Sequence, residues 1–413
     1  MTALLIRGGR IVDPATSLDA LRDLRLRDGT IVEIGEHLEP NDGEELLDLA
    51  GAVVAPGFVD MHVHLREPGF PQKETLESGT AAAVRGGFTA VACMPNTDPA
   101  LDEPEILLSL AREVERRARC RVYPIGAITR GRKGIEPCDF SALSGAGAVA
   151  FSDDGDTVQN ARVLRDAAFL ARELSAPFIS HCEDPSLKDA PGSPASAEDV
   201  IVARDLLIAA EAAKSWHIAH LTTRGALELI RCARSKRARV TCEVTPHHLF
   251  FTEAVRQELG DAARVNPPLR TQEDVEALRR GVRDGTIDVF ASDHAPHTHQ
   301  EKSGEVGPAP PGFSGLEIAV GAYAAALPDL PMARFVELLS TNPARILGVP
   351  GGRLALGEPA DVTIFADRAW VVDPSTFASK GKCTPFAGHR LPRKVLATIV
   401  GGDIRYRAAK LDG

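Results

Sequence analysis

The sequence predicts an α/β protein: a (β/α)8 TIM barrel beside a small β-sandwich domain built from both chain termini. Two observations lead to this prediction. Between residues 53 and 350, short apolar strands alternate with helix-like segments, and eight such units fill that length. Before and after this region, the chain carries short strands and turns whose apolar faces need a partner layer. A barrel of this type takes up about 250 residues as one domain, so it accounts for most of the chain.

Composition limits the possible functions. The formal net charge is −10, and no block of Lys and Arg offsets it, so we expect no nucleic-acid partner. No apolar stretch has the length that a membrane span needs, and the N-terminus lacks the pattern of a signal peptide. The seven cysteines contain no Cys-x-x-Cys pair and indicate reduced thiols. We therefore expect a cytoplasmic protein without a membrane partner.

Three segments follow from the change in rhythm along the chain. Residues 1–52 form the N-terminal part of the β domain, with a hairpin at Asp28-Gly29. Residues 53–350 form the barrel. Residues 351–413 form the C-terminal part of the β domain, with strands at 360–365 and 395–402.

The eight barrel strands are predicted as short apolar runs. Helix-like segments at 103–118, 161–174, 197–213 and 225–234 lie between them. The strands are expected at 53–64, 88–93, 121–128, 148–151, 177–181, 216–220, 239–244 and 287–292. In this barrel type, chemistry gathers at the C-terminal ends of the strands.

The first strand ends in an alternating pattern of chemically active side chains. Residues i and i+2 of a strand face the same side, so His62 and His64 point together and Arg66 follows in phase. Neutral imidazole is the commonest protein metal ligand, and two on one face form half of a metal site.

Other predicted strand ends supply the second half. Singly, each such residue could be a helix cap or a satisfied polar group, but jointly they indicate a metal centre. The residues in question are Asp154 after the fourth strand, His181 after the fifth, His220 after the sixth and Asp293 after the eighth.

The remaining histidines are not predicted as ligands. His247 and His248 are adjacent and would point to opposite sides of a strand. His217 shows no pattern that assigns it a role, whereas His294 is a candidate to support the ligands from outside.

Several motifs together resemble the amidohydrolase superfamily and, within it, the long type I bacterial dihydroorotases. The resemblance covers nearly the whole chain, including both β flanks. Its motifs are residues 56–69, 94–97, 152–155, 181–184, 243–249, 265–270 and 292–297.

The resemblance implies a two-zinc centre. His62, His64 and Asp293 are similar to the ligands of a first zinc, and His181 and His220 to those of a second. Asp154 resembles the carboxylate that bridges the pair. Many members of the superfamily use a carboxylated lysine there, but no lysine occurs between Lys133 and Lys188. Because the aspartate arm is shorter, partial occupancy of the second zinc site is the alternative to full occupancy.

The resemblance also implies a reaction. N-carbamoyl-L-aspartate would be cyclised reversibly to (S)-dihydroorotate and water, a step of de novo pyrimidine (UMP) biosynthesis. A metal-activated hydroxide would attack the ring amide, and Asp293 would act as general base and acid.

The substrate carries a carboxylate, for which a guanidinium offers a two-point fork. Arg66 is the first candidate, and the alternative for it is an ion pair with Glu67 or Glu74. By resemblance, the substrate contacts are His64, Arg66, Asn96, Asn266, His297, Pro311 and Gly312. The loop from 298 to 311 is the candidate lid, and residues 310–314 are stiff for such a loop.

The resemblance further implies a homo-oligomer, taken as a dimer, and aspartate transcarbamoylase as a partner. Two alternatives stay open. One is another cyclic amidohydrolase, a hydantoinase or allantoinase, against which Asp154 and Arg66 argue. The other is a non-catalytic scaffold for aspartate transcarbamoylase, against which the six retained ligands argue.

Overall fold

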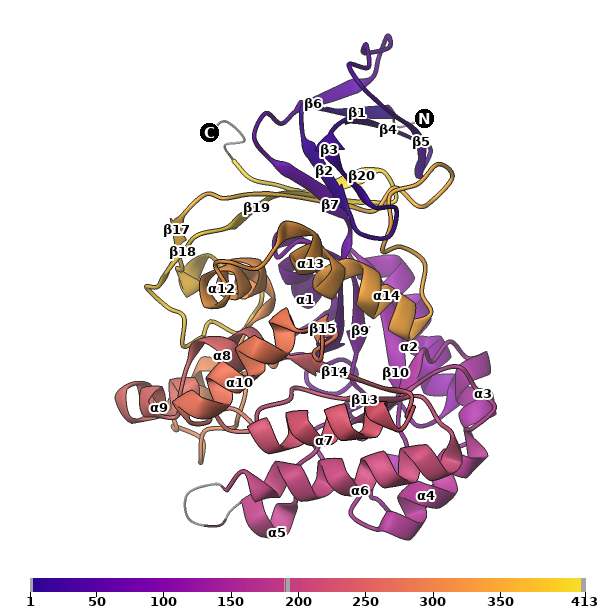
Figure 1. Ribbon diagram of the computed structural model, residues 1–413, viewed down its shortest axis with the longest axis vertical. Helices are drawn as coiled ribbons and strands as arrows, with labels where there is room; N and C mark the ends of the chain where they lie inside the picture. The colour runs from indigo at the N-terminus through magenta and orange to yellow at the C-terminus, as the bar shows by residue number, and fades with distance from the viewer. Residues whose placement is uncertain (1–2, 189, 191–193, 410–413) are drawn as a thin grey trace.

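The computed structural model describes residues 3–188, 190 and 194–409, which form a barrel with a β-sandwich above it (Figure 1). The barrel contains eight strands in the order β15-β14-β13-β12-β11-β10-β9-β8, and each neighbouring pair is parallel. The strands are β8 (Phe58–Val63), β9 (Phe88–Cys93), β10 (Arg121–Gly126), β11 (Ala150–Phe151), β12 (Phe178–Ser180), β13 (Trp216–Ile218), β14 (Val240–Val244) and β15 (Val289–Phe290).

The barrel closes between its first and last strands. Val63 forms a parallel bridge with His294, and the backbone N–H of His64 donates to the carbonyl of His294 at 2.9 Å. The Asp60 carboxylate in β8 accepts from the backbone N–H of Ser292 at 3.1 Å. These contacts join the two edges, and the predicted (β/α)8 barrel is confirmed.

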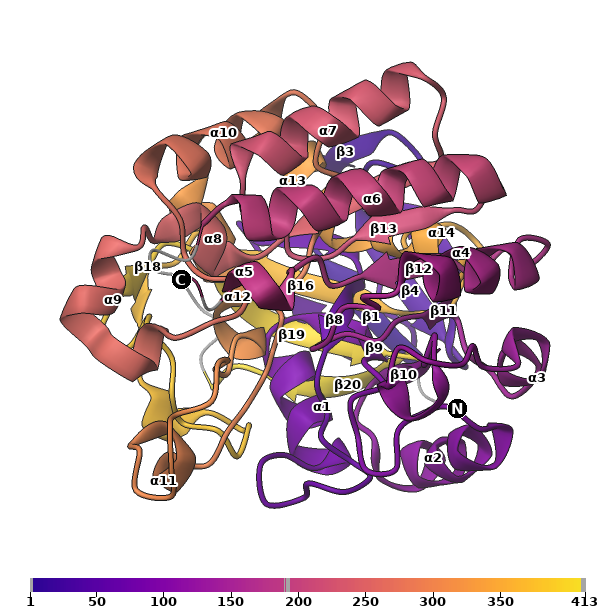
Figure 2. The same cartoon turned by 90° about the horizontal axis from the view of Figure 1, so that it is seen from below.

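Helices surround the strands, as the view from below shows (Figure 2). Some of them carry side-chain caps at their starts: Thr75 closes a capping box at the start of α1, and Asn160 caps α4. The longer ones are α1 (Leu76–Arg85), α2 (Pro104–Arg117), α4 (Ala161–Leu170), α6 (Ser196–Ala212), α7 (Arg224–Ser235), α10 (Gln272–Arg283) and α12 (Ala319–Ala326).

Shorter elements fill the loops between these helices and the strands. The short helices are α3 (Phe140–Gly145), α5 (Pro185–Lys188), α8 (Pro246–Phe250), α9 (Ala254–Leu259), α11 (His299–Lys302), α13 (Met332–Val336) and α14 (Asn342–Leu347). The 3-10 turns are η1 (Arg130–Arg132), η2 (Gly260–Ala263), η3 (Leu316–Ile318) and η5 (Pro374–Thr376), and η4 (Glu337–Thr341) is a π-helical turn. A separate two-stranded ribbon pairs β17 (Trp370–Val371) with β18 (Arg390–Leu391).

The β-sandwich takes strands from both parts of the chain, as predicted, and its two sheets enclose a separate apolar core that includes Ile6, Leu24, Val54 and Ile364. The four-stranded sheet has the order β5-β4-β1-β6, and the six-stranded sheet has the order β20-β19-β16-β7-β2-β3. Their bounds are β1 (Ala3–Arg7), β2 (Arg10–Asp13), β3 (Leu18–Leu21), β4 (Asp23–Arg27), β5 (Thr30–Gly35), β6 (Glu45–Asp48), β7 (Val53–Pro56), β16 (Val362–Ala366), β19 (Lys394–Val400) and β20 (Asp403–Arg407).

The structure corrects one predicted strand. The apolar run at 53–64 is not a single strand: β7 pairs with β2 and β16 in the sandwich, and β8 then begins the barrel. Gly57 joins the two, and a Cβ there would lie 2.1 Å from Thr89 Oγ1, so only glycine allows this close approach. A continuous apolar pattern cannot reveal this break, because both strands are buried.

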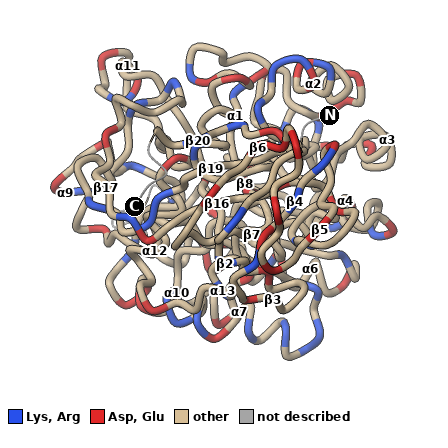
Figure 3. The backbone as a smooth tube through the Cα atoms, turned by 90° about the horizontal axis from the view of Figure 1, so that it is seen from above, with Lys and Arg blue, Asp and Glu red and all other residues tan. Residues whose placement is uncertain are grey.

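Surface charge is mixed. In the view from above, segments with Lys and Arg lie interspersed with segments carrying Asp and Glu (Figure 3). Over the described ranges, none of the helices combines the length and the apolar character that crossing a membrane would require.

Candidate metal centre

The structure brings the six predicted metal ligands together at the C-terminal end of the barrel. His62 lies in β8 and His64 directly follows it. The others each lie in the first residues after a barrel strand, and these are Asp154 after β11, His181 after β12, His220 after β13 and Asp293 after β15. All six are at most 9% exposed.

One cluster consists of His62, His64 and Asp293. One ligand atom from each residue can be chosen so that all lie within 4.8 Å of one another. Asp293 Oδ1 lies 3.2 Å from His64 Nε2 and 3.6 Å from His62 Nε2. Two ligands of one tetrahedral zinc are separated by about 3.3 Å, since Zn–N distances are about 2.0–2.1 Å. The spacing therefore suits a single cation.

A second cluster forms around Asp154. Its Oδ1 lies 3.4 Å from His181 Nδ1 and from His220 Nε2, and those two ring nitrogens are 3.0 Å apart. Its Oδ2 faces the other way, 3.4 Å from His62 Nε2. The carboxylate thus lies between the two groups of histidines, where a bridging ligand has to lie.

Two orphaned atoms support the metal fit. His62 Nε2 and Asp154 Oδ1 are fully buried, and neither has a hydrogen-bond partner among the described residues. Buried polar atoms are normally paired, because an unpaired one costs about 1–3 kcal/mol. The donors are histidine nitrogens and carboxylate oxygens, which are ligands that Zn²⁺ accepts. Burial opposes ionisation of Asp154, but His62, His181 and His220 outweigh it and hold its pKa well below the usual value.

Outer partners fix the tautomers of three of the histidines. His62 Nδ1 donates to Glu243 Oε1 at 2.6 Å, and His64 Nδ1 donates to Asn96 Oδ1 at 2.8 Å. Both rings therefore present the lone pair of Nε2 to the centre. His181 is turned the other way: its Nε2 lies 3.3 Å from Glu183 Oε2, so its Nδ1 faces Asp154.

Backbone conformation is unusual at three residues of the site. Arg66, His220 and Asp293 have φ values of 64°, 31° and 47°. This left-handed region is costly for residues with a side chain, and such residues concentrate at functional sites. The sharp turns bring their side chains into the mouth of the barrel directly after the strands end.

A cavity of about 210 Å³ opens over the two clusters. The structure places every predicted substrate contact on its wall. The lining residues are His64, Arg66, Asn96, Asp154, Gly155, His181, His220, Asn266, Asp293, Ala295, His297, Pro310, Pro311 and Gly312. Asn96 is a wall residue and also the partner of His64.

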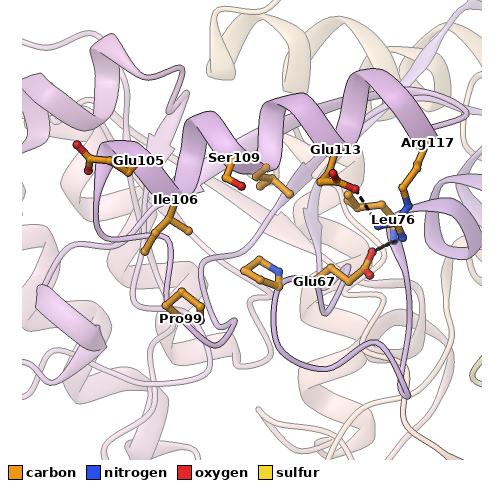
Figure 4. A pocket seen from close by; sticks show the side chains of 10 residues that line it. Glu67, Leu76, Pro99, Glu105, Ile106, Ser109, Glu113 and Arg117 are labelled. Atoms are coloured by element: carbon orange, nitrogen blue, oxygen red, sulfur yellow. Dashed lines mark hydrogen bonds and ion pairs between the residues drawn. The ribbon is translucent and has the colours of Figure 1, made fainter.

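Arg66 makes neither of the alternative ion pairs. Glu67 instead accepts from Arg117 of α2 at 2.6 Å, across an apolar groove on the outside of the barrel (Figure 4). Glu74 accepts from Ser379 and lies 3.3 Å from His294 Nε2. Within the described ranges, no carboxylate lies within 4 Å of the Arg66 guanidinium, which contacts only the Pro296 carbonyl and the ring of His297.

The charge of Arg66 persists in this setting. Burial lowers its pKa to about 10, so it is still protonated at neutral pH. Burial, together with the charges of Arg66 and Lys73, lowers the pKa of His297 to about 3, so that ring is neutral. His297 donates through Nε2 to the carbonyl of Pro311 at 2.9 Å. The cavity thus offers a fixed cation beside uncharged hydrogen-bonding groups.

The loop from 298 to 311 is tied down at several points. Thr298 and Glu301 form a capping box at the start of α11, and Glu301 pairs with Lys73 at 2.9 Å. Lys302 donates to the carbonyl of Pro310 at 3.0 Å, and the N–H of Gly312 donates to Arg264 at 2.9 Å. The stiff segment at 310–314 therefore forms a wall of the cavity.

The structure corrects the predicted geometry of His247 and His248 and gives His217 a role that the sequence pattern did not assign. His247 and His248 lie in the short helix α8, not in a strand, and their rings are 4.3 Å apart instead of pointing to opposite sides. His217 is fully buried, and its Nε2 lies 3.2 Å from Glu243 Oε2, so it is part of the support of His62. The signal for Glu243 was its place in a matched motif, but no local pattern pointed to His217. The structure places His294, as predicted, outside the ligands and hydrogen-bonded around them.

The fold, and the paired clusters that could hold metal ions, are those of a hydrolase of the amidohydrolase superfamily. Comparison with solved structures agrees. An L-hydantoinase from Arthrobacter aurescens aligns with a TM-score of 0.85 at 25% identity, covering 98% of this chain and 96% of that one. A D-hydantoinase aligns with a TM-score of 0.89 at 22% identity, covering 98% and 95%, and shows the shared fold.

Sequence comparison narrows the class. A family model described as Dihydro-orotase-like matches residues 51–226. Dihydroorotases from Pelotomaculum thermopropionicum and Syntrophus aciditrophicus are 47% and 43% identical, covering 97% and 98% of this chain and 98% and 99% of theirs. The one from Aquifex aeolicus is 40% identical, covering 98% of this chain and all of its own length. The chain belongs to the dihydroorotase family.

Proposed function

We propose that the chain is a zinc-dependent dihydroorotase that interconverts N-carbamoyl-L-aspartate and (S)-dihydroorotate in pyrimidine biosynthesis. The observation that carries the proposal is the position of Asp154 between two histidine groups, under a cavity lined by the Arg66 guanidinium, which forms no ion pair with any carboxylate of the described residues. The two clusters would hold the metal ions that activate water and polarise an amide carbonyl. Arg66 would bind the carboxylate of an acidic substrate.

The metal ligands would be His62, His64 and Asp293 on one side and His181 and His220 on the other, with Asp154 shared. When bound, zinc lowers the pKa of a water toward about 7 and polarises the amide carbonyl that is attacked. Two Zn²⁺ against two carboxylates and one hydroxide leave a single positive charge, which favours an anionic substrate. We propose two zinc ions per chain, with partial occupancy of the second site as the alternative.

Asp293 would move the proton. Its Oδ1 is directed at the ring nitrogens of His64 and His62, at the floor of the cavity. Burial opposes its ionisation, but His64 and His62 outweigh that effect and keep its pKa below the usual value, so it is a carboxylate at neutral pH. It can accept the proton of the attacking water and then deliver it to the leaving ring nitrogen. Such transfer is typically worth about 10²–10⁴-fold in rate.

Arg66 would hold the carboxylate of the substrate. A planar guanidinium binds a carboxylate through two parallel hydrogen bonds, and this one has no protein carboxylate to compete for it among the described residues. Asn96, Asn266 and His297, together with the backbone at Pro311 and Gly312, would complete the contacts from the cavity wall. Substrate orientation then follows from one charged contact and several neutral ones.

Three further proposals concern the location of the protein in the cell, its oligomeric state and its binding partner. Seven free cysteines, five of them buried, fit a reducing compartment, and we propose a cytoplasmic location. By resemblance to type I dihydroorotases, we propose a dimer and aspartate transcarbamoylase as a binding partner. A scaffold without activity is disfavoured, because the six ligands of the centre are all present.

A substrate panel tests the proposed function. Purified protein, metal-depleted and then reloaded with zinc, is assayed with dihydroorotate, hydantoin and allantoin. We expect activity on dihydroorotate only after reloading. A site built to hydrogen-bond a substrate group rejects analogues that lack that group by about 10⁴–10⁵-fold, so hydantoin and allantoin, which lack the carboxylate, are expected to be poor substrates. The shared fold with hydantoinases favours hydantoin as the alternative substrate. If hydantoin is turned over faster than dihydroorotate, the chain is a hydantoinase and the proposal is wrong. No turnover of any substrate, with no zinc bound, would favour the scaffold.

A further inference from the structure

Glu243 in β14 holds two of the metal ligands from behind. It is completely buried, with no exposed side-chain surface. Its Oε1 accepts from His62 Nδ1 at 2.6 Å and from the backbone N–H of His220 at 3.3 Å. Its Oε2 lies 3.2 Å from His217 Nε2, and His217 Nδ1 lies 2.7 Å from Thr241 Oγ1. One carboxylate therefore joins strands β8, β13 and β14.

The hydrogen bond from His62 to Glu243 fixes the tautomer and the orientation of the His62 ring. Because Nδ1 donates to a carboxylate, the lone pair of Nε2 is directed at Asp154 and Asp293. A charged carboxylate acceptor also makes the imidazole ring more basic than an uncharged acceptor does. By contrast, the partner of His64 is the uncharged amide of Asn96.

The contact with His220 acts on the backbone. His220 has a φ of 31°, a conformation that residues with a side chain rarely adopt. Glu243 Oε1 accepts from its N–H, and the Glu243 backbone carbonyl accepts from the next residue, Leu221, at 2.9 Å. The turn that carries His220 is thus held on both sides by the same residue of β14.

We propose that Glu243 is a positioning residue that sets the zinc affinity of the centre, acting through His62 on one cluster and through the turn of His220 on the other. His217 keeps the Glu243 carboxylate in place. The proposal rests on the proposed zinc centre but concerns a residue that touches neither metal nor substrate. Outer hydrogen-bond partners of metal ligands typically contribute about 10–100-fold to metal affinity.

The test is a zinc competition titration on the purified, metal-depleted full chain, with a chromogenic chelator as competitor. For Glu243→Gln we expect zinc affinity to fall by about 10–100-fold. Glu317→Gln is the control, because the Glu317 side chain is only 8% exposed but pairs with Arg85 and accepts from the backbone of Ala378 and Ser379 instead of from a metal ligand. Its zinc affinity is expected to equal that of the wild type.

Unfolding of the metal-free protein separates positioning from general damage. A single cooperative transition is expected for Glu243→Gln and shows that the variant is folded, although its midpoint is expected to fall because the carboxylate loses its pairing with His62 and His217. Glu243→Asp keeps the charge but shortens the arm by one methylene, so it cannot hold both contacts, and a smaller loss of affinity is expected. Wild-type zinc affinity in Glu243→Gln, or in Glu243→Asp if the glutamine variant does not fold, overturns the proposal. A wild-type chain that binds no zinc at all overturns the proposed function instead.

Discussion

Asp154 Oδ2 lies 3.4 Å from His62 Nε2, although His62 lies in β8 and Asp154 follows β11, and β9 and β10 lie between these two strands in the barrel. The second oxygen of the same carboxylate lies 3.4 Å from the ring nitrogens of His181 and His220. A single aspartate is thus within reach of both histidine groups.

Arg66→Met tests the carboxylate clamp. A hydrogen bond to a charged group contributes about 1.5–3 kcal/mol, so loss of the guanidinium is expected to raise KM for dihydroorotate about 10–100-fold. The turnover number is expected to fall less, because the reacting atoms lie at the metal centre. Steady-state kinetics in both directions measure the effect, with Arg116→Met, an exposed arginine of α2, as control. Unchanged KM in Arg66→Met would refute the clamp.

Asp293→Asn tests the proton transfer. Asparagine tolerates the left-handed backbone, with φ of 47°, better than most residues do, so the turn is expected to persist. Its amide cannot accept a proton as a carboxylate does. We expect the turnover number to drop by about 10²–10⁴-fold, with a smaller change in KM. Zinc content is measured on the same samples; a variant that keeps its zinc and its turnover would show that another group moves the proton.

The raised pKa of Glu317 predicts that the stability of the fold depends on pH, independently of the metal centre. Burial raises the pKa of Glu317 to about 7, above the model-peptide value of 4.5. The folded chain therefore holds this proton more tightly, and the contribution is fully present below pH 4.5 and is lost as pH rises through 7. Glu317→Gln should be more stable than the wild type at pH 8, by at most about 3 kcal/mol, and the difference should vanish near pH 4. Thermal unfolding across this range measures it, and a pH-independent difference would contradict the assignment.

Much of the site is predictable from local pattern. Alternation in a strand places His62 and His64 on one side, and parallel strands end at one face, which brings Asp154, His181 and Asp293 to the same mouth. These side chains do meet at the barrel mouth in the structure. They could be predicted because strand alternation and the common end of parallel strands depend only on strand geometry. The prediction of Asn266 and Gly312 as substrate contacts rests on the resemblance alone, because no local pattern marks them; both line the cavity.

Other features depend on packing between distant segments, which a local pattern does not contain. The break at Gly57 follows from the approach of Thr89, and the role of His217 follows from Glu243, 26 residues further along the chain. Thr245 caps the short helix that contains His247 and His248, and Pro246 lies in its first turn. This is a local helix-start signal, which the prediction of a strand at this point overlooked.

The bridging role of Asp154 is tested most directly by measuring carbamoyl-aspartate cyclisation together with zinc content for the wild type and Asp154→Ala. Asp156→Ala is the control, because that neighbouring aspartate is exposed and pairs with Arg132 instead. The account predicts that Asp154→Ala loses zinc and loses cyclisation by about 10²-fold or more, while Asp156→Ala keeps both. Cyclisation and zinc content at the wild-type level in Asp154→Ala would contradict it.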